Sequence, residues 1–189
     1  IKLVVMSATL EGDRVASHLG GEHLAGEGRM FPVAVHYRPA AKATLPNDRD
    51  LAQRVAAAVD ASSGDPGDVL VFLPGEREIR ETAEALRKHH PKGAEIMPLY
   101  ARLSFEEQDE VFRAHGARRI VLATNVAETS ITIDGIRHVV DSGVARVARY
   151  DAERGIGTLL LEPISRASAD QRKGRAGRTA PGTCHRLWT

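Results

Sequence analysis

Residues 171–178 read QRKGRAGR, a stretch that places four cations and two glycines in eight positions. Ser168 stands three residues before Gln171, which is the spacing of a capping box, so the pattern predicts a helix that begins at Ser168. Gln171, Arg175 and Arg178 are spaced i, i+4 and i+7 and therefore share one face of that helix. A guanidinium group is planar and always charged, and it fits the paired oxygens of a phosphoryl group. The stretch predicts a phosphate-binding helix, and the alternative is a solvated basic helix.

Apolar runs of strand length alternate with segments of helical spacing along the rest of the chain. Strands are expected at residues 1–6, 33–37, 69–73, 96–99, 119–123, 138–140 and 184–188, and helices at residues 49–61, 76–90 and 104–115. Residues 144–150 and 155–161 are expected to form a β-hairpin with a polar tip. This alternation is typical of an α/β fold with a mostly parallel sheet and helices on both faces.

Composition narrows the class of protein. The 189 residues suffice for one compact α/β domain and an additional segment. A net charge of +1 excludes a uniformly basic coat for nucleic acid, so any contact with a polyanion must be local. Cys184 is the one cysteine, which excludes an internal disulfide and favours a reducing, cytoplasmic location. It has no second ligand pair at metal spacing, so no metal site is expected. Neither a membrane span nor a signal peptide is expected.

Short polar segments follow three of the expected strands. Ser7 and Thr9 follow the first strand, Gly75 follows residues 69–73, and Thr124 and Asn125 follow residues 119–123. Ligands of open parallel sheets bind at the carboxyl ends of the strands, where these segments are expected to lie. Each segment alone is compatible with an ordinary turn, and their order along the chain is the informative observation.

In this order the segments resemble motifs III to VI of superfamily 2 helicases. The matching stretches are SAT at residues 7–9, FLPG at 72–75, ATNVAETS at 123–130 and QRKGRAGR at 171–178. The NVAETS wording and the hairpin resemble the DEAH-box branch, and residues 72–86, 98–103 and 162–178 are similar to the bacterial HrpA/HrpB-type RNA helicases. The resemblance extends from residue 4 to residue 188. It implies a RecA-like fold of the P-loop NTPase helicase C-terminal type, with the β-hairpin before the last helix.

The resemblance also assigns the parts of the chain to domains. No Gly-x-x-x-x-Gly-Lys-[Ser/Thr] loop and no Asp-Glu-x-His stands in the sequence, whereas in the family both precede motif III in the first RecA-like domain. Residues 1–30 are therefore expected to be the end of that first domain and a linker. Residues 31–189 are expected to be the second RecA-like domain, with the hairpin at about residues 144–161. A longer protein with a preceding RecA-like domain and further C-terminal domains is expected, and this chain alone is expected not to hydrolyse ATP.

The resemblance implies that ATP and Mg²⁺ bind between the two domains, with the first domain holding most of the metal ligands. Gln171, Arg175 and Arg178 would face the γ-phosphate, and the two arginines would act as arginine fingers. Such fingers stabilise charge on the transferring phosphoryl group.

The base and ribose contacts are also carried over from the resemblance. Phe112 stands at the position that stacks on adenine, and Thr132 and Asp134 match positions that hold the ribose. The alternative for Phe112 is a core aromatic at helical spacing with Phe105. The alternative for Asp134 is an ordinary Asp134-Gly135 turn.

On the nucleic-acid side, the resemblance implies that Gly75, Thr124 and Asn125 contact the RNA backbone. Contacts to the backbone without base readout give sequence-independent binding. Ser7 and Thr9 would couple the nucleotide state to the grip on RNA. The hairpin at residues 144–161 would separate the strands of a duplex, and the alternative is a hairpin that packs on a neighbouring domain.

Some assignments stay open at the level of sequence. Glu128 either orients Arg175 or Arg178 or caps the segment after its strand. Two other functions are compatible with the chain, namely a nucleic-acid-binding module without chemistry and a DNA-directed superfamily 2 motor. The resemblance of residues 125–130 and of the hairpin favours RNA, although no residue is shown to read the 2′-hydroxyl.

Overall fold

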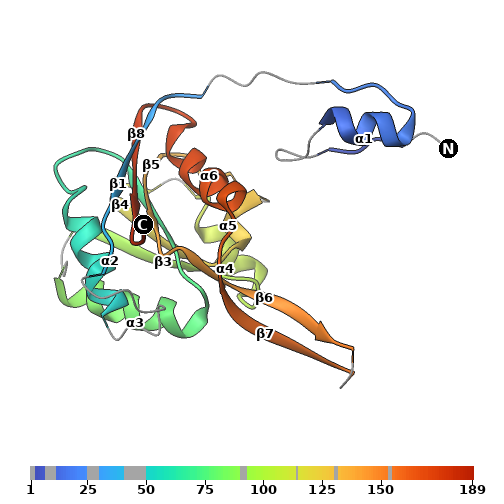
Figure 1. Ribbon diagram of the computed structural model, residues 1–189. Coiled ribbons are helices and arrows are strands. Elements are labelled where there is room, and N and C mark those ends of the chain that lie inside the picture. The colour runs from blue at the N-terminus through green and yellow to red at the C-terminus, as the bar shows by residue number, and fades with distance from the viewer. Residues whose placement is uncertain are drawn as a thin grey trace.

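The computed structural model describes residues 3–6, 12–24, 30–40, 50–89, 93–113, 115–129, 132–152 and 155–189. Its main body is a six-stranded sheet with the strand order β1-β8-β5-β2-β4-β3 (Figure 1). All five neighbouring pairs are parallel. The strands are β1 (Val33–Tyr37), β2 (Asp68–Phe72), β3 (Ala94–Leu99), β4 (Arg118–Ala123), β5 (Ile136–Asp141) and β8 (Gly182–Arg186). The predicted α/β fold with a parallel sheet is confirmed.

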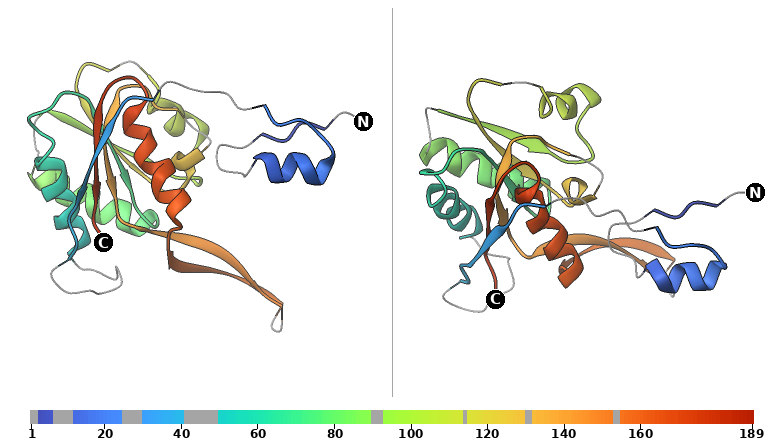
Figure 2. Two further views of the ribbon diagram at one scale, coloured as in Figure 1. Left: turned by 45° about the horizontal axis from the view of Figure 1, so that its top comes forward. Right: turned by 90° about the horizontal axis from the view of Figure 1, so that it is seen from above.

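Helices cover both faces of this sheet (Figures 1 and 2). The first face carries α2 (Leu51–Asp60) and α3 (Glu76–His89). The second carries α4 (Phe105–Glu110), α5 (Val126–Thr129), α6 (Arg166–Gly174) and the 3₁₀ turn η1 (Arg175–Gly177). Strand β2 is buried at every position because its side chains alternate between the two cores. Val69 and Val71 enter the core beneath α2 and α3, whereas Leu70 and Phe72 enter the opposite one.

The N-terminal segment differs from the prediction. Residues 3–6, the described part of the expected first strand, form no strand, and their four apolar side chains are exposed. An extended segment becomes a strand only when a neighbour pairs with its backbone, and none of the described residues does so. Helix α1 (Gly12–Leu19) follows and has no buried residue. No helix within the described ranges is long and apolar enough to cross a membrane.

Two helix boundaries also differ from the prediction. Helix α6 begins at Arg166 instead of Ser168, because Ser165 is the N-cap and its hydroxyl accepts a hydrogen bond from the Ser168 amide at 3.1 Å. Helix α4 has the predicted capping box between Ser104 and Glu107 but ends at Glu110, so Phe112 lies in the turn beyond it. The predicted face shared by Gln171, Arg175 and Arg178 is accordingly split between α6, η1 and the residue after it.

The predicted β-hairpin is confirmed. Strands β6 (Val144–Asp151) and β7 (Ile156–Pro163) form an antiparallel ladder that extends away from the sheet (Figures 1 and 2). Arg146 anchors its base, donating to both carboxylate oxygens of Glu78 on α3 at 2.8 and 3.0 Å. The outer part is solvent-exposed and includes Leu159 and Tyr150.

Candidate nucleotide and nucleic-acid site

The basic stretch at residues 171–178 contains a fully buried arginine, Arg172. Its Nε donates to Glu128 Oε2 at 3.0 Å and its Nη1 donates to Asp141 Oδ1 at 2.8 Å. The guanidinium also lies 4.8 Å from the centre of the Phe72 ring. Two carboxylates and an aromatic face compensate the cation for the loss of water, which a buried charge requires. Arg172 therefore fastens α6 to the ends of β2 and β5 and to α5.

Sequence reasoning missed Arg172 and left Glu128 open. Arg172 follows Gln171 directly, so it points about 100° away from the face that carries Gln171, toward the sheet. The signal available in the sequence was this offset from the predicted phosphate-binding face. Glu128 directs its carboxylate to Arg172, whereas its backbone carbonyl accepts a hydrogen bond from Arg175 Nη2. One residue of the α5 segment thus holds two arginines of the basic stretch.

Arg175 and Arg178 lie together at the second face of the sheet. They line one pocket with Leu70, Ala127, Ile133 and Ile136. Arg175 is only 6% exposed, and burial, followed by the charge of Arg178, lowers its pKa to about 10, so it stays charged at neutral pH. Arg178 is exposed and donates to the Thr132 hydroxyl. The structure thus brings together three predicted nucleotide contacts. Gln171 is half-buried on α6, before the turn that carries Arg175.

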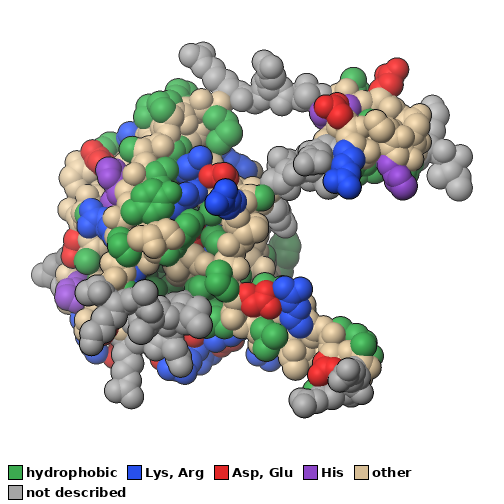
Figure 3. Space-filling view, viewed as in Figure 1, with side chains coloured by type: hydrophobic (Ala, Val, Ile, Leu, Met, Phe, Trp, Pro, Cys, Tyr) green, Lys and Arg blue, Asp and Glu red, His purple; other side chains and the backbone are tan. Residues whose placement is uncertain are grey.

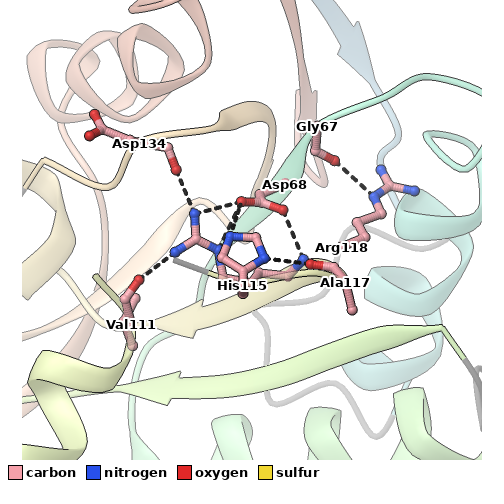
Figure 4. Close-up of polar contacts among 8 residues, drawn as sticks. Gly67, Asp68, Val111, His115, Ala117, Arg118 and Asp134 are labelled. Carbon is pink, nitrogen blue, oxygen red and sulfur yellow. Dashed lines mark hydrogen bonds and ion pairs between the residues drawn. The ribbon is translucent and has the colours of Figure 1, made fainter. Parts of the chain in front are cut away.

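The predicted base and ribose contacts, Phe112 and Asp134, lie on two surface segments that are joined through one buried arginine, Arg119. Figure 4 shows the carbonyls of Val111 and Asp134 that this arginine binds. Phe112 is 44% exposed and Phe105 is also exposed, so the alternative of a core aromatic pair is wrong. Asp134 is exposed and precedes Gly135, whose φ of +88° marks a turn. Arg119 donates one hydrogen bond to the Val111 carbonyl, next to Phe112, and another to the Asp134 carbonyl, both at 2.6 Å.

The predicted RNA contacts lie at the carboxyl ends of β2 and β4, which are neighbours in the sheet. Thr124 is half-buried and Asn125 exposed, and their carbonyls accept hydrogen bonds from Ala127 and Glu128 in the first turn of α5. Gly75 is buried, and a Cβ added there would lie 1.8 Å from Arg146 Nη1. Ser7 and Thr9 lie outside the described residues.

The face of the molecule shown in Figure 3 carries charges of both signs. On the face shown in Figure 3, Lys and Arg side chains are dispersed among apolar and acidic ones and form no continuous basic surface among the described residues. Cys184 is buried in β8, and burial raises the pKa of its thiol to about 12, as expected for a core residue.

Comparison with known proteins identifies the family. The model of the helicase conserved C-terminal domain matches residues 50–180. The chain belongs to this family. It is 48% identical over 191 aligned residues to the ATP-dependent RNA helicase HrpA of Escherichia coli, and the match covers the whole chain but 15% of that relative. The chain is 47% identical to the HrpA homolog of Haemophilus influenzae, and the match covers 14% of that relative. It is 40% identical to the pre-mRNA-splicing factor ATP-dependent RNA helicase prp22 of Schizosaccharomyces pombe, and the match covers 17% of that relative.

Solved structures agree with this helicase C-terminal domain assignment. The crystal structure of the Escherichia coli DEAH/RHA helicase HrpB matches 97% of the chain, with a TM-score of 0.84 and 40% identity, and the match covers 23% of that protein. The domain is therefore a RecA-like domain of the DEAH-box HrpA/HrpB type, as the motifs indicated. The chain spans about a seventh of the HrpA-type relatives that it matches.

Proposed function

We propose that the chain is part of an ATP-dependent RNA helicase, in which residues 31–189 are the second RecA-like domain and residues 1–30 the end of the first. The observation that carries the proposal is the convergence of Arg175 and Arg178 on one pocket beside Thr132. The names of the relatives support it, since HrpA and prp22 are both ATP-dependent RNA helicases.

In this proposal Arg175 and Arg178 act as arginine fingers on ATP that the preceding domain binds together with Mg²⁺. The carbonyl of Glu128 holds the Arg175 guanidinium, so little reorganisation is needed when charge develops on the γ-phosphate. Arg178 is exposed and its partner is a neutral hydroxyl, so a phosphate oxygen can replace Thr132. Gln171 would complete the contacts to the γ-phosphate. Phe112 would stack on the base, and Thr132 and Asp134 would hold the ribose.

RNA would lie across the carboxyl ends of β2 and β4. Thr124 and Asn125 offer hydrogen-bonding groups at the point where β4 passes into α5. Helix α5 also contains Glu128, which contacts Arg172 and Arg175. A short path therefore joins the proposed RNA contacts to the proposed fingers. Gly75 would allow the RNA backbone to approach closely once Arg146 moves, and Ser7 and Thr9 would couple the two domains.

The proposal is tested in the intact enzyme by steady-state ATP hydrolysis with saturating RNA. Arg175→Ala and Arg178→Ala should each lower kcat about 10³-fold or more, with a smaller effect on nucleotide affinity, because fingers act on charge that develops in the transition state. Arg175→Lys should not restore activity, since ammonium lacks the planar fork. The exposed Arg166 at the start of α6, the helix that precedes the two fingers, provides a control, and kcat of Arg166→Ala should be near normal. Normal kcat in both finger variants would contradict the proposal.

The choice of RNA is tested separately. The ATPase activity of the intact enzyme should rise more with single-stranded RNA than with DNA of the same sequence. Equal or stronger stimulation by DNA would favour a DNA-directed motor. Normal binding of RNA without any ATP hydrolysis would favour a module without chemistry.

A further inference from the structure

Asp68 and Arg119 form a buried ion pair that is separate from Arg172, Arg175 and Arg178. Its further contacts connect several segments of the fold. Asp68 begins β2 and Arg119 lies in β4, and both side chains are almost completely buried. Asp68 Oδ2 accepts from Arg119 Nε at 2.8 Å, and Oδ1 accepts from the Arg119 amide at 2.8 Å. His115 also contacts this carboxylate, with Nε2 at 3.4 Å from Asp68 Oδ2 (Figure 4).

The two terminal nitrogens of the guanidinium also bind carbonyls from separate segments, and Nη2 lies 2.7 Å from Asp68 Oδ2 as well. Nη1 donates to Val111 O and Nη2 to Asp134 O (Figure 4). Val111 directly precedes Phe112, and Asp134 lies in the short segment at residues 132–135. One rigid, planar group therefore sets the spacing between the two segments. Lysine could not do so, because a single ammonium cannot reproduce two divergent donors fixed in one plane.

The segment at residues 132–135 is held at both ends. At its start, Arg178 donates to the Thr132 hydroxyl, and Ile133 lines the pocket of the two proposed fingers. At its end, Gly135 packs so closely on the ion pair that a Cβ would lie 2.9 Å from Asp68 Oδ2. A continuous series of contacts thus runs from Arg178 through residues 132–134 to Arg119 and on to Val111.

We propose that Arg119, oriented by Asp68, is a positioning residue for nucleotide binding. It sets the distance between Phe112, which would stack on the base, and Asp134, which would hold the ribose. The inference rests on the proposed function, because it takes these two residues as nucleotide contacts. Arg119 itself is buried and touches no nucleotide. Its effect should therefore be confined to ligands that carry a base and a ribose, and should not extend to phosphate alone.

The test uses Arg119→Lys in the intact enzyme, which keeps the charge opposite Asp68 and the backbone bond but cannot bind both carbonyls. The readouts are the inhibition constants of ADP and of inorganic pyrophosphate against RNA-stimulated ATP hydrolysis. The constant for ADP should rise about tenfold, as for the loss of one base–aromatic stacking contact. The constant for pyrophosphate should not change, and kcat at saturating ATP should fall less than KM rises. An equal rise for both inhibitors would overturn the proposal.

Arg118 provides a matched control at the start of the same strand. Its guanidinium also binds carbonyls, that of Gly67 at 2.9 Å (Figure 4) and that of Ser62 at 2.9 Å, and neither residue is next to a proposed nucleotide contact. Arg118→Lys should lower thermal stability without changing either inhibition constant. If it raises the ADP constant as much as Arg119→Lys does, the effect is one of general stability and the proposal is wrong.

A double-mutant cycle separates this inference from the proposed function. Phe112→Ala should raise the ADP constant, and Arg119→Lys should add little in that background, because the residue it positions is gone. If Phe112→Ala raises the constant and Arg119→Lys does not, only the role of Arg119 is wrong. If Phe112→Ala has no effect, the proposed base site is wrong and the positioning role falls with it.

A measurement on the unmodified enzyme keeps the proposal testable if Arg119→Lys does not fold. ADP should slow amide hydrogen exchange both in the peptide that contains residues 111–113 and in the peptide that contains residues 132–135. Pyrophosphate should slow exchange in neither peptide. Protection of one segment without the other would overturn the proposal that a single residue holds them in register.

Discussion

Arg172 and Glu128 form an ion pair in the interior of the domain, with Arg172 Nε 3.0 Å from Glu128 Oε2. The same guanidinium pairs with Asp141 at the end of β5, and the Glu128 carbonyl holds Arg175. The buried arginine and the proposed catalytic arginine are thus fixed by one residue of α5. Arg172 and Arg175 are three residues apart, and Arg172 contacts two carboxylates whereas Arg175 contacts a backbone carbonyl and lines the pocket.

We predict that Arg172→Met destabilises the domain strongly. Methionine keeps the length of the side chain but leaves Glu128 and Asp141 without their cation, and breaking a buried pair typically costs about 3–5 kcal/mol. The free energy of unfolding from urea denaturation measures the effect. Lys173→Met is the control, because the Lys173–Asp170 pair is solvent-accessible and worth about 0–1 kcal/mol. Similar losses in the two variants would contradict the structural role of Arg172.

We predict that His185 makes the domain less stable in mild acid. Burial, followed by the charge of Arg38, lowers the pKa of His185 from 6.5 to about 4, and Arg38 Nε donates to its Nδ1 at 3.1 Å, a bond that needs this nitrogen unprotonated. The folded protein therefore binds fewer protons than the unfolded chain between these values. The contribution of neutral His185 to the free energy of unfolding is fully present above pH 6.5 and is lost as the pH falls toward 4.

Urea denaturation at a series of pH values measures this contribution. His185→Asn should flatten the decline of the unfolding free energy in this window by about 1 kcal/mol per pH unit, near the limit for one proton. The decline at more acid pH should be retained, because the pKa of Glu78 is lowered: burial raises it, but the hydrogen bond from Arg146 and nearby positive charge outweigh that effect. Identical pH profiles for the two proteins would show that His185 is protonated in the folded state as readily as in the unfolded one.

We predict that Gly75→Ala acts through Arg146. The new Cβ would lie 1.8 Å from Arg146 Nη1, so the guanidinium must leave Glu78. The free energy of unfolding should fall by only about 1 kcal/mol, because the displaced guanidinium is at the end of a flexible side chain and its ion pair with Glu78 is partly exposed. In an Arg146→Met background the same change should have little effect, since the obstacle is absent. Gly64→Ala is the control, because nothing lies within 4 Å of a Cβ there. A loss that persists in the Arg146→Met background would contradict this explanation.

We predict that the hairpin is needed for strand separation and not for ATP hydrolysis. Replacing residues 150–157 with Asn-Gly joins Arg149 to Thr158, which already pair in the ladder, and keeps the Arg146–Glu78 anchor. The intact enzyme should retain RNA-stimulated ATP hydrolysis and lose duplex unwinding. A control with Gly-Ser-Gly-Ser at residues 152–155 keeps the length and should unwind normally. Equal loss of both activities would mean that the hairpin supports the fold.

The elements with strong local signals were predictable. The strands β2, β4 and β5 lie within two residues of the predicted positions, because continuous apolar runs between turn residues allow little else. The start of α6 was predicted at Ser168 from its spacing to Gln171, whereas Ser165 is the N-cap and Ser168 lies inside the helix. The extended backbone at Ser165 made it the cap, with φ −71° and ψ 162°.

The sequence by itself determined the alternation of strands and helices, the hairpin and the order of the motifs, because these depend on residues close together in the chain. Only the tertiary structure decided which arginines are structural. The partners of Arg172 are 44 and 31 residues away, and Asp68 is 51 residues from Arg119. Whether a cation is buried or faces a ligand depends on the carboxylates and carbonyls that the fold brings to it, and no local pattern contains that information.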